Sequence, residues 1–187
     1  MGARAAAVED TRRRILQSTF DLATDRKIAD ISLEDVAGGA DVSVQTVLRR
    51  FGSRADLIDA AFAFAQDQVV EERRAPVGDA AAAVTVVVDH YERRGDTSLL
   101  MLAQEDSDPL ARRVTDQGKR LHRAWITEVF GPLVADDEVL LDLLVVATDV
   151  YTWKLLRRDR ELSRARTEAR MKTLVASVLA TTDPEGS

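Results

Sequence analysis

Residues 31–61 read ISLEDVAGGADVSVQTVLRRFGSRADLIDAA, and this stretch decides the fold. Its first part carries apolar residues at the spacing of one helical face: Leu33, Val36, Ala37 and Ala40. Asp41 and Val42 then form a turn, and the hydroxyl of Ser43 can cap a second helix. The apolar side of that second helix is predicted to be Val44, Val47, Leu48 and Phe51. Two helices joined by so short a turn form a helix-turn-helix motif.

Outward from this motif, apolar spacing and breaker residues predict nine helices in all. Their expected ranges are 9–25, 33–39, 44–51, 54–74, 79–94, 97–105, 109–130, 136–158 and 163–180. Gly95 and Asp96 are expected to break the fifth helix from the sixth. Residues 1–8 are expected to form a loose arm and residues 181–187 a disordered tail.

Composition agrees with an all-α protein. Hydrophobic residues make up 45% and charged residues 31% of the 187 positions, and glycine and proline are sparse. The chain has no cysteine, which excludes disulfides and thiolate metal sites. Pro76 and Gly78 mark a boundary. They separate an amino-terminal domain at 9–55, with its motif at 33–52 and a connector helix at 54–74, from a carboxy-terminal domain at 76–181.

The net charge of −6 is unevenly distributed. Residues 1–57 hold nine Lys and Arg against nine Asp and Glu, so the remainder carries the whole negative charge. For a DNA-binding protein the local distribution matters more than the average. The longest uncharged apolar run, residues 80–88, is too short to span a membrane, and no signal peptide is visible. A cytoplasmic protein is expected.

Residues 10–60 resemble the tetracycline-repressor (TetR/AcrR) family of bacterial transcriptional regulators. The matching segments are RRRILQSTFDLATD at 12–25, ISLEDVAGGADVSVQTVLRRF at 31–51 and GSRADLIDAAF at 52–62. The resemblance implies a nine-helix architecture, a three-helix DNA-binding bundle and a larger bundle that dimerises through its last two helices. This sequence departs from the family pattern at two positions. Leu48 stands where the family usually has a phosphate-contacting Tyr, and Arg54 stands where it usually has Lys.

The helix at 44–51 is the expected recognition helix, because the major groove accepts one helix and its amino end reaches base edges. Gln45 can pair with adenine, Val44 can contact a thymine methyl group, and Arg49 can reach guanine or a phosphate. Phosphate contacts are expected from Ser32, Ser43, Thr46, Arg50 and Arg54.

Each of these residues also has a purely structural interpretation. Ser32, Ser43 and Ser53 can act only as helix caps, and Val44 can simply pack. Arg49 and Arg50, like the run at 12–14, can belong to solvated charged faces.

The helix predicted at 136–158 is apolar on two sides, so both sides need to be buried. One side can face its own bundle, and the other can face a second copy of the chain. The alternative is a thick monomeric core. The expected dimer interface is Leu141, Val145, Thr148, Thr152, Leu156, Met171, Leu174, Val175 and Val178. Two-fold symmetry would then match a pseudo-palindromic double-stranded DNA operator.

The resemblance also implies a small-molecule effector in the larger bundle. Candidate lining residues are His90, Tyr91, Met101, Gln104, Trp125, Tyr151 and Trp153, for each of which a place in the core or on the surface is the favoured alternative. They suggest an apolar or aromatic ligand with one or two polar groups. Its binding is expected to move the helix at 54–74 and lower DNA affinity, and repression is the expected mode.

Nothing in the sequence indicates catalysis. It has no GxSxG, HExxH or phosphate-binding glycine loop. The only histidines, His90 and His122, lack the neighbours of a metal site, so neither a metal nor a cofactor is expected. The remaining alternative is a helical adaptor that kept the fold and lost specific DNA binding, an idea to which Leu48 gives some weight.

Overall fold

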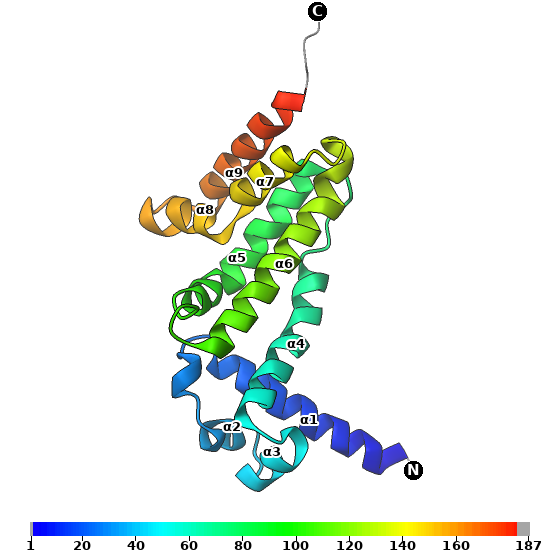
Figure 1. Ribbon diagram of the computed structural model, residues 1–187, viewed down its shortest axis with the longest axis vertical. Helices are drawn as coiled ribbons and strands as arrows, with labels where there is room; N and C mark the ends of the chain where they lie inside the picture. The colour runs from blue at the N-terminus through cyan, green and yellow to red at the C-terminus, as the bar shows by residue number, and fades with distance from the viewer. Residues whose placement is uncertain (1, 183–187) are drawn as a thin grey trace, which may run out of the picture. The chain divides into compact units, whose positions relative to one another are not determined.

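The computed structural model describes residues 2–182, and all regular structure in that range is helical (Figure 1). The predicted all-α fold is confirmed. The α-helices are α1 Gly2–Leu22, α2 Leu33–Gly39, α3 Val44–Phe51, α4 Arg54–Glu72, α5 Ala80–Leu102, α6 Pro109–Phe130, α7 Glu138–Thr148, α8 Val150–Lys154 and α9 Arg164–Leu179. Short turns of other helix types lie at Ile28–Asp30, Gly131–Leu133, Leu155–Asp159 and Ala180–Thr182. No helix in this range is long and apolar enough to cross a membrane.

The chain forms two compact units, which divide it differently from the predicted boundary. The first comprises Met1–Val69 and Leu100–Thr115, and the second comprises Val70–Leu99 and Asp116–Ser187. Two residues show why the segment 100–115 joins the first unit. Met101 is buried in that unit's core, and Gln104 accepts a hydrogen bond from the backbone N–H of Ile28 at 2.9 Å. These long-range contacts leave no mark in the local sequence.

Helix α1 begins earlier than predicted. Residues 5–8 belong to this helix and do not form a loose arm. Residues 5–7 are alanines, the strongest helix formers, so the helix extends through them. The helix ends at Leu22 and not, as predicted, at Asp25. Directly after this end, the hydroxyl of Thr24 donates to the carbonyl of Asp21 at 2.6 Å. At the other end of the chain, 181–182 lie in a short helical turn, and the rest of the predicted tail lies outside the described residues.

The core of the first unit is built where α1 meets α2, α3 and α4. Its fully buried side chains include Ile15, Leu16, Val47, Leu57 and Ile58. Gly39 permits the close approach of α2 to α1, because a Cβ there would lie 2.3 Å from the Ser18 hydroxyl. That hydroxyl donates to the carbonyl of Val36 at 3.1 Å. The helix-turn-helix is therefore held rigidly on α1.

The predicted break at Gly95 is wrong. Helix α5 runs through this position without interruption, and it includes most of the helix predicted at 97–105. Gly95 serves packing instead: a Cβ there would lie 2.5 Å from the buried ring of Trp153. An isolated glycine inside a helical pattern can mark close approach as well as termination.

The single helix predicted at 136–158 is also wrong. Asp149 adopts an extended conformation, ends α7 and caps α8 by accepting from the Tyr151 N–H at 2.8 Å. After α8 the chain forms a π-helical turn at Leu155–Asp159. The apolar run on both sides of Asp149 concealed this cap, although Asp is among the residues that best start a helix.

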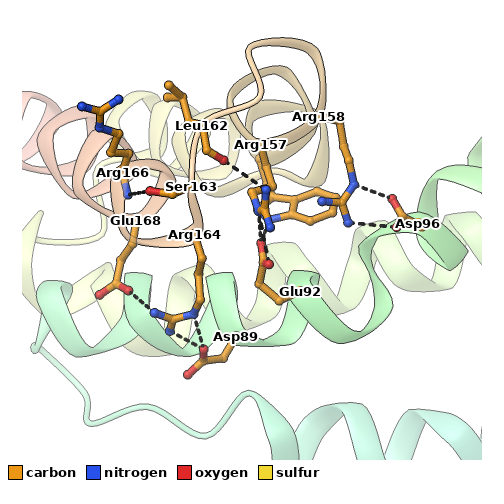
Figure 2. A network of polar contacts seen from close by, with 11 residues as sticks. Asp89, Glu92, Asp96, Arg157, Arg158, Leu162, Ser163, Arg164, Arg166 and Glu168 are labelled. Atoms are coloured by element: carbon orange, nitrogen blue, oxygen red, sulfur yellow. Dashed lines mark hydrogen bonds and ion pairs between the residues drawn. The ribbon is translucent and has the colours of Figure 1, made fainter.

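In the second unit, α7 packs against α9, and a row of acids on α5 holds the segment between α8 and α9 (Figure 2). Asp89 binds Arg164, Glu92 binds Arg157, and Asp96 binds Arg158. The spacing of the three acids places them along one face of α5. The π-helical turn and the start of α9 are therefore fastened to α5 by three ion pairs.

Candidate nucleic-acid interface

Helix α2 begins with a capping box. The Ser32 hydroxyl accepts from the Asp35 N–H at 3.0 Å, and the Asp35 carboxylate accepts from the Ser32 N–H at 3.2 Å. The Ser32 hydroxyl also donates to this carboxylate at 2.8 Å, and this bond, together with the one from the Ser32 backbone N–H, lowers the pKa of Asp35. The predicted cap at Ser32 is confirmed. Its hydroxyl is thus already engaged within the chain.

The turn between α2 and α3 depends on one residue in an unusual conformation. Asp41 has a φ of 52°, in the left-handed region that Asp tolerates better than most residues. The Val42 N–H then donates to the carbonyl of Ala37 at 3.0 Å. The guanidinium of Arg14, on α1, donates to the carbonyl of Ala40 at 2.6 Å. Both ends of the turn are thereby held in place.

Helix α3 has one inward face and one outward face. Ser43 caps it by accepting from the Thr46 N–H at 3.2 Å, and Gly52, with a φ of 80°, ends it. Val47 is fully buried, while Val44 and Phe51 are half-buried and pack against the core. The outward face carries the exposed residues Gln45, Leu48 and Arg49.

Leu48 therefore lies on the opposite side from the one predicted. It was expected on the apolar side of α3, but 40% of it is exposed. Its neighbours on this face are polar, so the leucine is an apolar patch on an otherwise hydrophilic surface. Its position is compatible with contact to an external partner.

The two arginines of α3 differ from those of α1 in their ion pairs. Arg12, Arg13 and Arg14 each meet Glu9 or Asp10 on their own helix, at 3.3 to 3.6 Å. Arg49 and Arg50, by contrast, have no carboxylate within 4 Å among the residues that the structure describes. The buried Nε of Arg50 also lacks an acceptor there. Each of these α1 arginines therefore has a carboxylate beside it, with Asp10 shared by two of them, whereas the arginines of α3 have none among the described residues.

Arg54 requires a correction. It was expected to stand at the start of α4 with its guanidinium available to phosphate. Instead its Nε donates to the carbonyl of Ile31 at 2.7 Å, and its Nη2 donates to the carbonyl of Ile28. The arginine is half-buried and ties α4 to the segment before α2, so its role in this structure is to position the motif.

A second polar cluster lies inside the second unit, around Arg73. This residue, which follows α4 directly, is only 7% exposed. Its Nη2 contacts Nδ1 of His122 at 2.6 Å, and its guanidinium lies 4.5 Å from the ring centre of Trp125. The indole N–H of Trp125 donates to the Arg73 carbonyl at 2.7 Å. The buried Nε of Arg73 has no acceptor among the described residues.

The hydrogen bonds of His122 run in one direction. Because Arg73 donates to Nδ1, the proton of the neutral ring lies on Nε2, which donates to the Thr148 hydroxyl at 3.2 Å. Thr148 in turn donates to the carbonyl of Leu144 at 2.7 Å. Burial, together with the positive charge of Arg73, lowers the pKa of His122 to about 3. The ring therefore offers Arg73 an acceptor and no negative charge.

Another cluster joins the end of α4 to α5. Arg94 holds Glu72 with hydrogen bonds to both carboxylate oxygens, at 2.7 and 3.0 Å, and these contacts lower the pKa of Glu72 to about 2. His90 contacts the same carboxylate at 3.2 Å. Burial lowers the pKa of His90 to about 4, so this imidazole is neutral near pH 7. The negative charge of Glu72 is committed to Arg94.

The predicted effector-lining residues are not all brought together. Met101 and Gln104 pack within the first unit, and Tyr151 is exposed. His90, Tyr91, Trp125 and Trp153 all belong to the second unit. Tyr91 donates to the Thr148 carbonyl at 3.1 Å, and the fully buried Trp153 donates to Glu92 at 3.0 Å. The aromatic members therefore serve the interior of the second unit.

Comparison with known proteins gives a structural match without a sequence match. No protein-family model matches the chain, and no curated protein sequence matches it significantly. Among solved structures, a TetR-family transcriptional regulator from Streptomyces coelicolor superposes with a TM-score of 0.73 at 21% identity, covering 97% of this chain and 83% of that one. A transcriptional regulator from Rhodococcus sp. RHA1 gives 0.71 at 16% identity, covering 91% and 96%.

The chain has the TetR fold. A TetR transcriptional regulator from Rhodococcus sp. RHA1 also matches, with a TM-score of 0.56 at 20% identity over 93% of this chain and 99% of that one. These matches cover most of both chains, so the TetR fold extends well beyond the helix-turn-helix from which the resemblance was first drawn.

Four of the nine residues predicted at a dimer interface are inside the TetR fold's own core. Leu141, Thr148, Met171 and Val175 are almost completely buried, which leaves them no surface for a partner. The other five are half-buried or exposed: Val145, Thr152, Leu156, Leu174 and Val178. The exposed apolar stripe of α7 is instead Val139, Leu143 and Val146. The exposed apolar residues of α7 are therefore not among the residues predicted at the interface.

Arg73 and His122 were not among the predicted site residues. Arg73 lies in the charged sequence EERR at 71–74, which is typical of a solvated helix end, and its neighbour Arg74 is indeed exposed. His122 had been considered only as a metal ligand. No local pattern separates Arg73 from Arg74, because its burial depends on α6.

Proposed function

We propose that this protein is a DNA-binding transcriptional regulator that binds a pseudo-palindromic operator as a homodimer. The observation that carries this proposal is the outward face of α3, where Gln45 and Arg49 are exposed and the positive charge of two arginines is uncompensated. A rigid helix with such a face fits the major groove, and phosphates would neutralise its arginines.

The contacts are divided by chemistry. Gln45 would pair with adenine, and Arg49, on the same face, would reach guanine or a phosphate. Arg50, Ser43 and Thr46 would meet phosphates, although both hydroxyls also contact each other at 3.0 Å. Val44 contributes less than expected because it is half-buried against the core. Arg54 and Ser32 are left out of the proposed phosphate contacts. The guanidinium of Arg54 donates to backbone carbonyls, and both the hydroxyl and the backbone N–H of Ser32 are bonded to Asp35.

Dimerisation would use the outward apolar stripe of the second unit. Val139 and Val146 are 68% and 64% exposed, and Leu143 and Leu174 are nearly half exposed. Because α7 packs against α9, these residues come from two adjacent helices. Two copies meeting there would cover both stripes and present two α3 helices to one operator.

Effector response would pass through α4. Its first residue, Arg54, donates hydrogen bonds to backbone carbonyls in the segment 28–31. Its last residue, Glu72, forms an ion pair with Arg94 on α5. A ligand that shifts the second end would move a helix whose first end supports the recognition motif. We expect effector binding to lower operator affinity, with repression as the mode of regulation.

The decisive experiment is selection of the purified protein against random double-stranded DNA. Enrichment of a two-fold symmetric site, with an affinity that falls as salt rises, is the expected result. Analytical ultracentrifugation of the free protein should show a dimer, which Val146→Glu should dissociate. Failure to enrich any sequence would reject the proposal.

A second candidate is a helical adaptor that retains the fold without specific DNA binding. The exposed Leu48 on the outward face of α3 favours it, since an apolar side chain contributes nothing to phosphate binding there. The same selection distinguishes the two, because an adaptor would enrich no DNA site.

A further inference from the structure

The buried guanidinium of Arg73 has fewer hydrogen-bond acceptors around it than it has donors, and no carboxylate of the described residues pairs with it. Its guanidinium can donate five hydrogen bonds, yet its contact with described side chains is one bond to a neutral imidazole and stacking on Trp125. No carboxylate of the described residues forms an ion pair with it, and its buried Nε has no acceptor there. A buried cation with no carboxylate in ion-pair contact is unfavourable, so proteins rarely retain one unless a ligand or partner supplies an acceptor.

The second tryptophan of the same unit shows what a completed site looks like. Arg158 also lies 4.5 Å from an indole ring, that of Trp153. It differs in having Asp96, whose carboxylate oxygens accept at 2.9 and 3.1 Å (Figure 2). Around Arg73 the arginine and the aromatic ring are present, and the carboxylate is missing.

We propose that Arg73 is the binding site for the carboxylate of a small acidic effector, whose apolar part lies beside Trp125. This deepens the proposed function, on which its regulatory meaning rests. A carboxylate matches the guanidinium because planar bidentate hydrogen bonds are the preferred geometry of this pair.

The surrounding charges favour a monoanion over a phosphate. His122 and His90 are neutral near pH 7, and Arg94 is committed to Glu72. Asp149, whose charge is felt by Arg73, would repel a second negative charge. Asp149 already offsets part of the positive charge of Arg73 without forming an ion pair with it, so the charge that remains suits a carboxylate better than a phosphate dianion.

The position of Arg73 gives this site a direct route to α4. It is the residue after Glu72, the last residue of that helix. A bound carboxylate would draw the guanidinium toward itself and act on the backbone that ends α4. The backbone carbonyl of Arg73 is held by Trp125, so the indole reports on the same movement.

The test measures binding to the full-length protein without DNA. Benzoate and octanoate are titrated to about 10 mM, the range in which fragments of this size bind, while tryptophan fluorescence and melting temperature are followed. Benzamide is the uncharged match, and inorganic phosphate is the second anion. Saturable binding of a carboxylate, at least tenfold tighter than that of benzamide and phosphate, is expected.

Two substitutions locate the site. Arg73→Met should weaken carboxylate binding by about tenfold or more, since it removes the charge-assisted hydrogen bonds. It should leave the melting temperature of the free protein unchanged or higher, because the replaced cation is unpaired. Arg158→Met is the matched control, and it should bind the carboxylate as the unaltered protein does. Arg73→Lys, which keeps the charge, should retain intermediate affinity.

Each alternative outcome overturns the proposal. These are no saturable response to either carboxylate, equal binding of benzamide, tighter binding of phosphate, or unaltered carboxylate binding by Arg73→Met. If Arg73→Met does not fold, Arg73→Lys and the comparison of benzoate with benzamide still decide. Because DNA is absent, failure here is distinct from failure to enrich an operator, which would reject the proposed function and leave the carboxylate site standing.

Discussion

The tripeptide Leu-Arg-Arg occurs twice in this chain, at 48–50 and at 156–158, and the two copies have opposite environments. In the second copy, Arg157 meets Glu92 and Arg158 meets Asp96, both on α5 (Figure 2). In the first copy neither arginine has a carboxylate within 4 Å among the described residues. The comparison teaches that an arginine's role depends on which distant element faces it, since the local sequence is the same.

Lowering the pH should give the largest difference in stability between the unit that holds residues 156–158 and the unit that holds residues 48–50. His90 and His122 both lie in the second unit, with pKa values of about 4 and about 3, below the ordinary 6.5. Below pH 6.5 these histidines bind protons in the unfolded chain but remain neutral in the folded chain. Their contribution to the free energy of unfolding is therefore fully present above pH 6.5 and is lost as the pH decreases. Each histidine should cost about 2 kcal/mol by pH 5.

The lowered pKa of Glu72 acts in the same direction at lower pH, since its stabilisation is lost as pH falls from 4.5 toward 2. Urea unfolding from pH 7 to pH 5 measures the contribution of the two histidines to the free energy of unfolding. A free energy of unfolding that stays level over this range would show that the two imidazoles are not buried in neutral form.

Glu92→Ala should give the largest effect of any substitution near 156–158. It leaves the Nε of Arg157 and the indole N–H of Trp153 without their acceptor. We expect a loss of about 3 kcal/mol in the free energy of unfolding. Asp106→Ala, which removes an exposed ion pair of Arg112, is the control and should cost under about 0.5 kcal/mol.

Gln45→Ala tests whether α3, the helix that carries the first copy, recognises bases. Gln45 is exposed one turn before Arg49 on α3. Its removal should weaken operator binding by about 2 kcal/mol and relax the preference at one base position. Binding to a set of operator variants measures this, and an equal loss for every variant would contradict base recognition.

Arg50→Ala and Arg158→Ala are the sharpest paired test of the comparison. The first should weaken operator binding by about 1 kcal/mol for all sequences and reduce the salt dependence by about one phosphate contact. The second should leave operator binding and its salt dependence unchanged, because Arg158 is committed to Asp96. Equal effects of the two substitutions would remove the distinction between the copies.

Arg54→Ala should have the smallest effect on operator binding of the substitutions in the amino-terminal domain. Its guanidinium donates to backbone carbonyls before α2, so its loss should lower the free energy of unfolding by about 1 kcal/mol. The salt dependence of operator binding should not change. A reduced salt dependence would return Arg54 to the phosphate contacts.

Local sequence predicted the elements that depend on neighbouring residues. The caps at Ser32 and Ser43, the ends of α2 and α3, and the start of α6 at Pro109 all follow from interactions within one turn of helix. Errors arose where a residue had two local meanings. Gly95 permits the approach of Trp153 and does not end a helix, and Asp149 starts a helix within a run that looked continuous.

By itself the sequence determined the helix-turn-helix, the all-α class and the outward position of Gln45, because capping and helical periodicity act over a few residues. Only the tertiary structure decided which arginines are neutralised, which face of α7 is exposed, and that Arg73 is buried beside a neutral histidine. Those properties depend on charges and surfaces brought together from distant positions. Burial gives such charges their strength, and burial is settled only when the helices pack.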